Sequence, residues 1–206
     1  MSKQELATVV YTALKDHTLK LSKNRTVVSV FTQDNKQVRF KTDSIGLPFG
    51  ANVNKFKTFG PSEYYLDCSI SPSLKTELEN LCTMIQNLIH ENQSLFNVEN
   101  LTLDQIKSSW THPIRTDGYG SKIRVKIARN KSTDDLDFNV FDANQGATSK
   151  EQYVFVDDKN INQVFKPKSR VMMAIKIGNV YHFKEKFGLT LFASQIKFEK
   201  ATPLKA

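Results

Sequence analysis

Three cations alternate with three apolar residues over Lys122–Ile127. Successive side chains of a strand point to opposite faces, so this order predicts a strand with Lys122, Arg124 and Lys126 on one face. Like charges side by side repel one another unless counter-charges neutralise them. The counter-charges are either nucleic-acid phosphates or carboxylates on a neighbouring strand. We favour phosphates, because further cations extend the stretch, namely Arg115, Arg129 and Lys131.

Aromatic side chains accompany the cationic segments. Tyr119 stands between two glycines, and Tyr181 and Phe183 stand in a short segment that follows a glycine and ends at Lys184. Stacking of a nucleobase on an aromatic ring contributes about 1–3 kcal/mol and tolerates any base. Any single aromatic residue is more often part of a core, but these three, next to glycines and cations, are our candidates for base stacking.

Residues that could carry catalysis are scattered. The four histidines lack the spacing of metal ligands, and the sequence has no phosphate-binding glycine loop and no nucleophile elbow. Asp134, Asp135 and Asp137 are an alternative, since clustered carboxylates hold divalent ions in nucleases. We interpret them as turn residues at strand ends. We therefore expect a protein that is not an enzyme and that needs no cofactor and no metal.

Composition limits the class of partner and compartment. The 206 residues carry a formal net charge of +8, which favours polyanionic partners. Only two cysteines are present, Cys68 and Cys82, so we expect neither a disulfide framework nor a zinc site. A reducing compartment fits this composition. No apolar run approaches the length of a membrane span, and the N-terminus lacks the apolar stretch of a signal peptide. We expect a soluble intracellular protein.

Periodicity predicts the elements that position these residues. An N-terminal amphipathic helix is followed by a hairpin of residues 25–32 and 37–42 and by a long loop over 43–61. Ser71 and Pro72 mark the start of a long helix with an apolar stripe from Leu74 to Ile89, and Thr102 with Gln105 marks a second helix. Further strands are predicted at 63–70, 121–128, 135–141, 153–156, 170–177 and 189–198.

The order of the elements from Glu63 to Lys200 carries a resemblance. A strand, a long helix, a basic strand, its hairpin partner and two closing strands follow one another. The most similar segments are Phe165–Arg170, Phe187–Leu189, Gln195–Ile196 and Asp117–Tyr119. In these features the chain resembles the viral single-stranded-DNA-binding proteins of OB fold, found in short-tailed phages and in nucleocytoplasmic large DNA viruses.

The resemblance implies a five-stranded barrel with a cationic, aromatic face that holds single strands without sequence preference. It also implies a role in viral DNA replication and recombination, by coating and protecting single strands. By matching segment it adds Lys168, Arg170 and Lys176 as binding residues. The full set of candidate nucleic-acid-binding residues is Lys122, Arg124, Lys126, Arg115, Tyr119, Lys168, Arg170, Lys176, Tyr181, Phe183 and Lys184.

The expected fold class is α+β. We expect an OB-fold-like antiparallel barrel over 62–200, with a long helix after the first barrel strand. A helix and hairpin elaboration over 1–61 precedes it, and a short tail over 201–206 follows. Many members of the family end in an acidic tail that recruits polymerase, and this sequence shows no such tail, so the recruitment of replication proteins is left open. If the protein is viral, we expect it in the host cytoplasm or nucleus.

Three alternatives stay open beside single-stranded DNA binding. RNA is one, because OB barrels bind both nucleic acids. A metal-dependent nuclease acting through the Asp134 cluster is another. The third is a virion or scaffold protein that forms homo-oligomers through the apolar stripe of the long helix.

Overall fold

Strands make up most of the structure, because apolar and polar residues alternate along much of the chain. The computed structural model describes residues 19–24, 27–54, 60–142 and 152–199. Its strands are β1 (Leu19–Asn24), β2 (Val27–Thr32), β3 (Arg39–Lys41), β4 (Ile45–Leu47), β5 (Ala51–Val53), β6 (Tyr64–Ser69), β7 (Trp110–Thr111), β8 (Ile114–Asp117), β9 (Gly120–Ile127), β10 (Asn139–Asp142), β11 (Gln152–Val154), β12 (Ser169–Phe183) and β13 (Lys186–Glu199).

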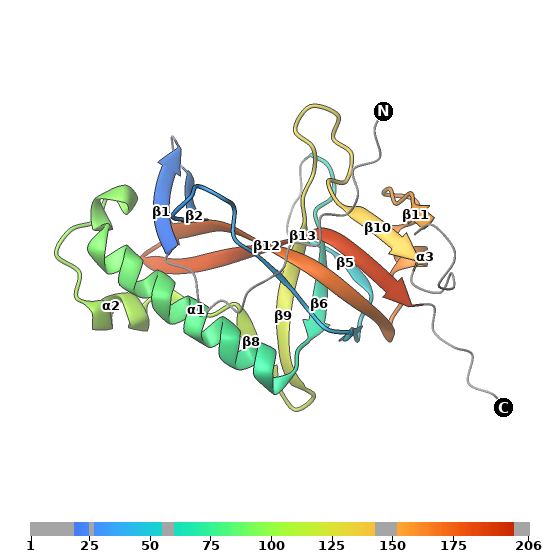
Figure 1. Ribbon diagram of the computed structural model, residues 1–206, viewed down its shortest axis with the longest axis horizontal. Helices are drawn as coiled ribbons and strands as arrows, with labels where there is room; N and C mark the ends of the chain where they lie inside the picture. The colour runs from blue at the N-terminus through green and yellow to red at the C-terminus, as the bar shows by residue number, and fades with distance from the viewer. Residues whose placement is uncertain (1–18, 25–26, 55–59, 143–151, 200–206) are drawn as a thin grey trace.

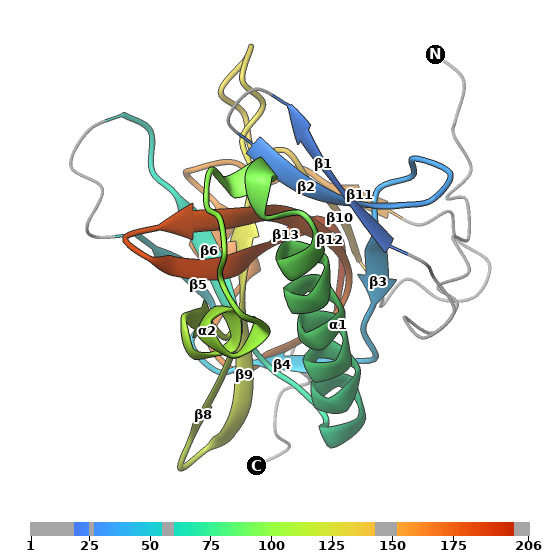
Figure 2. The same cartoon turned by 90° about the vertical axis from the view of Figure 1, so that its left-hand side faces the viewer.

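Five of these strands close into a barrel (Figures 1 and 2). Around the ring the order is β4, β6, β9, β13 and β12, and β12 pairs again with β4. Every neighbouring pair is antiparallel except β9 and β13, which run parallel. The predicted α+β class with an OB-like barrel is therefore confirmed. Because β4 precedes β6 in the chain, the long helix follows the second ring strand and not, as the sequence predicted, the first.

Helix α1 (Pro72–Glu91) begins where the sequence predicts. The Ser71 hydroxyl accepts a hydrogen bond from the Leu74 N–H, and Pro72 occupies the first turn, where no backbone donor is needed. The predicted apolar stripe from Leu74 to Ile89 faces the chain's own core. Since these side chains are already buried, the stripe is not free for the self-association considered above.

The remaining helices are short. They are η2 (Gln93–Phe96), α2 (Leu103–Ser108) and α3 (Ile161–Val164). The predicted capping box at α2 is confirmed, because Thr102 and Gln105 each bond the backbone N–H of the other, at 2.7 and 3.2 Å. No helix in the described ranges has both the length and the hydropathy needed to cross a membrane.

The hairpin expected over residues 25–42 is wrong. Strand β2 pairs with β1 and with β12, and β3 pairs with β12. Among the described residues no ladder joins β2 to β3, and the one bridge between the two segments, Phe31 to Gln37, lies before β3. The predicted turn between them does form, with Asn35 at a φ of 62°. The two strands diverge because β12, with 15 residues, is long enough to pair with them one after the other along the same edge. The predicted N-terminal helix lies outside the described residues.

The segment expected as a long loop over 43–61 contains two strands. β4 pairs with β6 and β12 and closes the ring, and β5 pairs with β6. Both strands have three residues, too few for an alternating pattern to be visible among the surrounding glycines and prolines. Strands β3, β4 and β5 thus pair directly with barrel strands.

The strands predicted after the helices are present. β9 and β11 match closely, and the two closing strands are longer than predicted. β10 begins at Asn139 and pairs with β11 and β13, so its prediction as the hairpin partner of the basic strand β9 is wrong. β12 and β13 form a hairpin that is part of the barrel wall. Its tip projects beyond the barrel, toward β1, β2 and α2 in Figure 1. Register shifts after Ala174 and Ile177 let this hairpin bend as it leaves the barrel.

Both cysteines are predicted to be chemically silent in the native protein. Cys68 and Cys82 are buried and free, and burial raises the pKa of both thiols, that of Cys82 to about 12. Since the thiolate is the reactive form, neither should react with a water-soluble aromatic disulfide at neutral pH until the chain unfolds. The measurement is thiol titration with and without denaturant. Prompt reaction of a thiol under native conditions would contradict this packing.

Candidate nucleic-acid interface

The alternation predicted for β9 holds on its apolar side. Ile123, Val125 and Ile127 are buried in the barrel. On the other side, however, the three cations differ from one another. Lys122 is only 7% exposed, Arg124 is half-buried, and Lys126 is exposed. Each of them therefore has a different electrostatic role.

The Lys122 ammonium is already neutralised. It donates to both carboxylate oxygens of Asp117, at 2.6 and 2.7 Å. The hydrogen bond from Lys122 is also the main reason that the pKa of Asp117 lies below its usual value. Asp117 sits on β8, next to the turn that leads into β9. Because its ammonium is buried in this pair, Lys122 does not offer a free charge to a phosphate.

Arg124 is neutralised by a carboxylate on the adjacent strand. Its Nε and Nη2 donate to the two oxygens of Asp67 on β6, at 2.9 and 3.0 Å. These bonds raise the pKa of the guanidinium, which also lies 3.8 Å from the ring centroid of Tyr65. A bidentate pair stacked on an aromatic ring is geometrically well defined. For Lys122 and Arg124 the carboxylate alternative weighed from the sequence describes what the structure shows.

Lys126 is different. It is exposed, and it has no ion pair with any of the residues that the structure describes. In the ladders on either side of β9 it stands opposite Tyr65 of β6 and Phe192 of β13. Residues directly opposite in a ladder share one face of the sheet, so both aromatic side chains flank this cation on the outside of the barrel.

The pattern continues across two further strands. Phe192 stands opposite Lys176 of β12, and Lys176 stands opposite Arg39 of β3. The outer surface thus carries one transverse row of alternating aromatic and cationic residues. The row consists of Tyr65, Lys126, Phe192, Lys176 and Arg39. With about 4.8 Å between neighbouring strands, it spans roughly 19 Å of the barrel surface.

Two glycines let aromatic rings lie against the backbone of the β12–β13 hairpin. A Cβ on Gly178 would lie 2.5 Å from the Phe192 ring, and a Cβ on Gly188 would lie 2.2 Å from the Tyr181 hydroxyl. Any side chain at these positions would push the ring away. Phe192 is therefore held in place in the row, and Tyr181 has one side covered by the strand.

The predicted residues at the hairpin tip lie apart from the row. Phe183 is 67% exposed, and the turn after it places Lys184 and Glu185 at positive φ angles of 49° and 62°. The Lys184 ammonium lies 5.4 Å from the Phe183 ring centroid. Along β12 the tip is seven residues from Lys176, or roughly 23 Å. The sequence therefore placed in one site residues that the structure divides between two.

The remaining predicted residues lie near the opposite end of β12 and beside β9. Arg170 is held by Ser44, with Nε on the hydroxyl at 3.1 Å and Nη2 on the carbonyl at 2.9 Å. Lys168 is exposed and precedes β12 at a φ of 67°. Arg115 stands opposite Lys122 on β8, and Tyr119, in the turn after β8, is 91% exposed.

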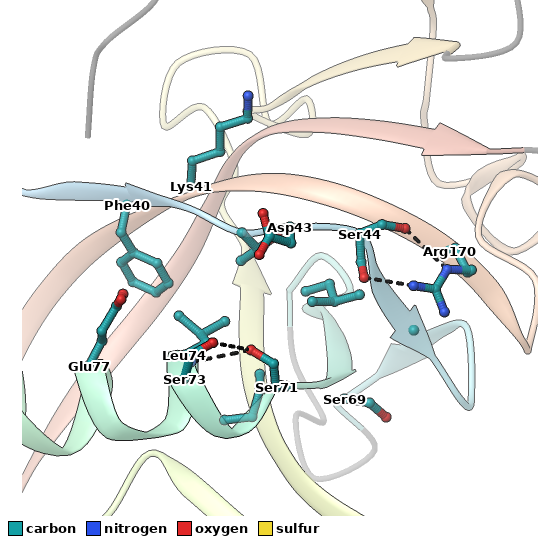
Figure 3. A pocket seen from close by; sticks show the side chains of 14 residues that line it. Phe40, Lys41, Asp43, Ser44, Ser69, Ser71, Ser73, Leu74, Glu77 and Arg170 are labelled. Atoms are coloured by element: carbon teal, nitrogen blue, oxygen red, sulfur yellow. Dashed lines mark hydrogen bonds between the residues drawn. The ribbon is translucent and has the colours of Figure 1, made fainter. Parts of the chain in front are cut away.

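A polar cleft lies beside Arg170, between the start of α1 and the chain that links β3 to β4 (Figure 3). It has a volume of about 460 Å³, and Asp43, Ser71 and Glu77 are among its 14 lining residues. Some of its polar side chains bond one another, as Figure 3 shows for Ser71 with Ser73 and for Arg170 with Ser44. None of the lining residues is histidine or cysteine, so the cleft contains no nucleophile paired with an imidazole base.

The aspartates considered for a nuclease lie in the turn after β9 and just beyond it. Asp134 has a φ of 61° in the turn after β9, and its carbonyl accepts a bond from Arg129. Arg129 also pairs with Asp158, which lowers the pKa of that carboxyl. Within the described part of the chain, no group of three or more histidine, cysteine or acidic side chains is placed to hold a metal ion.

Three members of the transverse row were missed from the sequence, although each left a signal. Arg39 alternates with the buried residues on either side of it, which marks it as outward-facing. Tyr65 and Phe192 are aromatic residues in the outward phase of strands whose neighbouring residues are buried. An aromatic residue in the solvent phase of a strand is the pattern that would have identified both.

No protein-family model matches the chain, and no curated protein matches it either. Among solved structures, the chain is similar to the single-stranded DNA-binding protein from bacteriophage Enc34 in complex with ssDNA, with a TM-score of 0.49 and 11% identity over 91% of this chain and 99% of that chain. A C-terminal truncation of that protein gives 0.44 and 11%, over 90% and 96% of the two chains. A further structure of it gives 0.43 and 12%, over 91% and 93%. We base the functional assignment on this chain's own residues.

The difference between neutralised and free cations is testable through stability. Arg124→Ala leaves the half-buried Asp67 carboxylate without its partner, so it should lower the free energy of unfolding by about 1–3 kcal/mol. Lys126→Ala removes an exposed, unpaired cation and should change it by less than about 0.5 kcal/mol. The free energy of unfolding of both variants is measured by urea denaturation. Equal effects of the two substitutions would show that Asp67 does not hold Arg124 in this way.

Proposed function

We propose that this protein binds single-stranded DNA without sequence preference, across the transverse row on the outside of its barrel. The observation that carries the proposal is the alternation of rings and free cations from Tyr65 to Arg39. An unpaired strand offers the same alternation, because it exposes flat bases along a chain of phosphates. Rings stack on any base, and lysine and arginine attract any phosphate, so the row needs no particular sequence.

The row favours an unpaired strand over a duplex. In a duplex the base faces are stacked on one another and are not accessible to protein rings, whereas base edges are read by hydrogen-bonding side chains. The row places aromatic rings beside its cations Lys126, Lys176 and Arg39, and such rings can stack only on bases that are not already stacked in a duplex. Stacking and charge together are typical of single-strand binding.

We further propose that the protein acts by coating and protecting single strands, without catalysis, in DNA replication or recombination. The likeness of element order to the viral proteins of OB fold from short-tailed phages and nucleocytoplasmic large DNA viruses supports this role. Binding on the outside of the barrel leaves the far side of the bound strand accessible to enzymes. Such a role requires affinity for any sequence and release as the strand is copied, which stacking and screened charge both allow.

The test is the salt dependence of affinity for a labelled oligothymidine. Wild-type affinity should fall with salt, and Lys126→Gln and Lys176→Gln should each lower the affinity and reduce the log–log slope by roughly 0.7. Phe192→Leu should weaken binding by about 1–3 kcal/mol with an unchanged slope, because it removes a stacking surface and no charge. Lys107→Gln on α2 is the matched control and should have no effect.

Duplex DNA and RNA of the same length serve as competitors in the same assay. Single-stranded DNA should compete best. A flat salt response, equal competition by duplex, or row variants that bind like the control would each contradict the proposal. Stronger competition by RNA would assign the same surface to RNA instead.

A further inference from the structure

Two exposed aromatic rings lie near the buried Lys122, close to the start of β9. The Lys122 ammonium lies 5.8 Å from the ring centroid of Phe49 and 5.6 Å from that of Tyr119. The two rings come from different loops, one after β4 and one between β8 and β9. A single ammonium therefore makes cation–π contacts with both rings while it remains ion-paired with Asp117.

Both loops are fixed by their backbone. In the first loop, Gly50 has a φ of 67°, and a Cβ there would lie 2.4 Å from the carbonyl oxygen of Phe165, so the turn beside Phe49 sits tightly against the chain before β12. In the second, the Tyr119 N–H donates to the Asp117 carboxylate at 2.9 Å. The aromatic side chains are thus presented by ordered turns, which lowers the entropy cost of binding a ligand.

The exposure of these rings is unusual for packing residues. Phe49 is 54% exposed and Tyr119 is 91% exposed, so most of each ring faces solvent. Cations flank them. Arg115 stands opposite Lys122 in the β8–β9 ladder, and the Lys168 N–H bonds the Leu47 carbonyl two residues before Phe49. Both of these cationic side chains are exposed.

We propose that Phe49 and Tyr119 form a second base-stacking subsite for the same single strand that occupies the transverse row. The inference rests on the proposed function and extends it along β9. Lys122 lies four residues from Lys126, roughly 13 Å along the strand. Arg124 stands between them on the same outer face, and its guanidinium lies on the Tyr65 ring of the row. A strand bound to the row would therefore pass over Arg124 to reach the subsite, and Lys122 is the positioning residue for its two rings.

The subsite has an electrostatic signature that separates it from the row. Because Asp117 already neutralises Lys122, a base that stacks on the two rings gains no ion pair with this ammonium, and removal of the rings removes no charge. Loss of the two rings should reduce affinity equally at every salt concentration. Loss of a free cation in the row should instead reduce the salt slope.

The experiment compares the full chain with the double variant Phe49→Ala/Tyr119→Ala, using oligothymidines of increasing length. With the longest oligonucleotides the variant should bind roughly 10-fold or more weakly than wild type, with an unchanged salt slope. With oligonucleotides too short to reach beyond the row, the two proteins should bind alike. The matched control, Tyr153→Ala/Phe155→Ala, removes two rings of similar exposure on and beside β11 and should bind like wild type.

Each outcome decides one of the two proposals. If wild type binds in a salt-dependent way and the double variant equals it at all lengths, the subsite is refuted and the proposed function stands. An altered salt slope in the double variant would overturn the stacking assignment, since it would mean that charges were lost. If wild type itself fails to bind single-stranded DNA, the proposed function fails and the subsite fails with it.

Discussion

Strand β9 pairs with β6 along one edge and with β13 along the other, and these two ladders determine which side chains stand together outside the barrel. The constraint is geometric. In a ladder, every residue is fixed opposite one partner and on one face, so a shift of one residue would move each outward side chain into the core. The registers of β12 with β13 and with β3 extend the same constraint to Lys176 and Arg39. The alternation of rings and cations depends on all four registers at once.

Net charge is a poor guide to which cations of this molecule are free to meet a polyanion. The chain carries a formal charge of +8, yet two of the three cations on β9 are held by aspartates. A neutralised cation must lose its carboxylate before it gains a phosphate, so it adds little to affinity. What Arg124 and Lys122 do instead is orient aromatic rings, Tyr65 in one case and Phe49 with Tyr119 in the other. Of the three cations on β9, Lys126 is the one whose charge is not paired with an aspartate.

The same division explains how rings can stay exposed without disordering the surface. Each ring is held against something rigid: Phe192 against Gly178, Tyr65 against Arg124, and Tyr119 near Lys122. A ring held in this way has fewer conformations to lose when a base stacks on it. A surface prepared in advance suits the proposed binding of single strands of any sequence.

The sequence predicted the elements better than their partners. Alternation located β9 and β12, and the Ser71–Pro72 signal located α1, because these signals are local. The short strands β4 and β5 carry no such signal, and the pairing of β2 with β1 instead of β3 depends on the length of β12. Likewise, nothing local indicates that Asp67 neutralises Arg124, since the two are 57 residues apart in the chain. The sequence therefore located an exposed cation where a residue's own strand decides exposure, as at Lys126, and could not show neutralisation where a neighbouring strand decides it.

The most direct test of the account is a lysine footprint on the bound protein. Acetylation of surface lysines is measured residue by residue, with and without saturating oligothymidine. Binding across the row predicts that Lys126 and Lys176 become protected while exposed Lys107 and Lys159 keep their reactivity. Protection confined to Lys184 and Lys186 at the hairpin tip, with Lys126 and Lys176 unchanged, would contradict it.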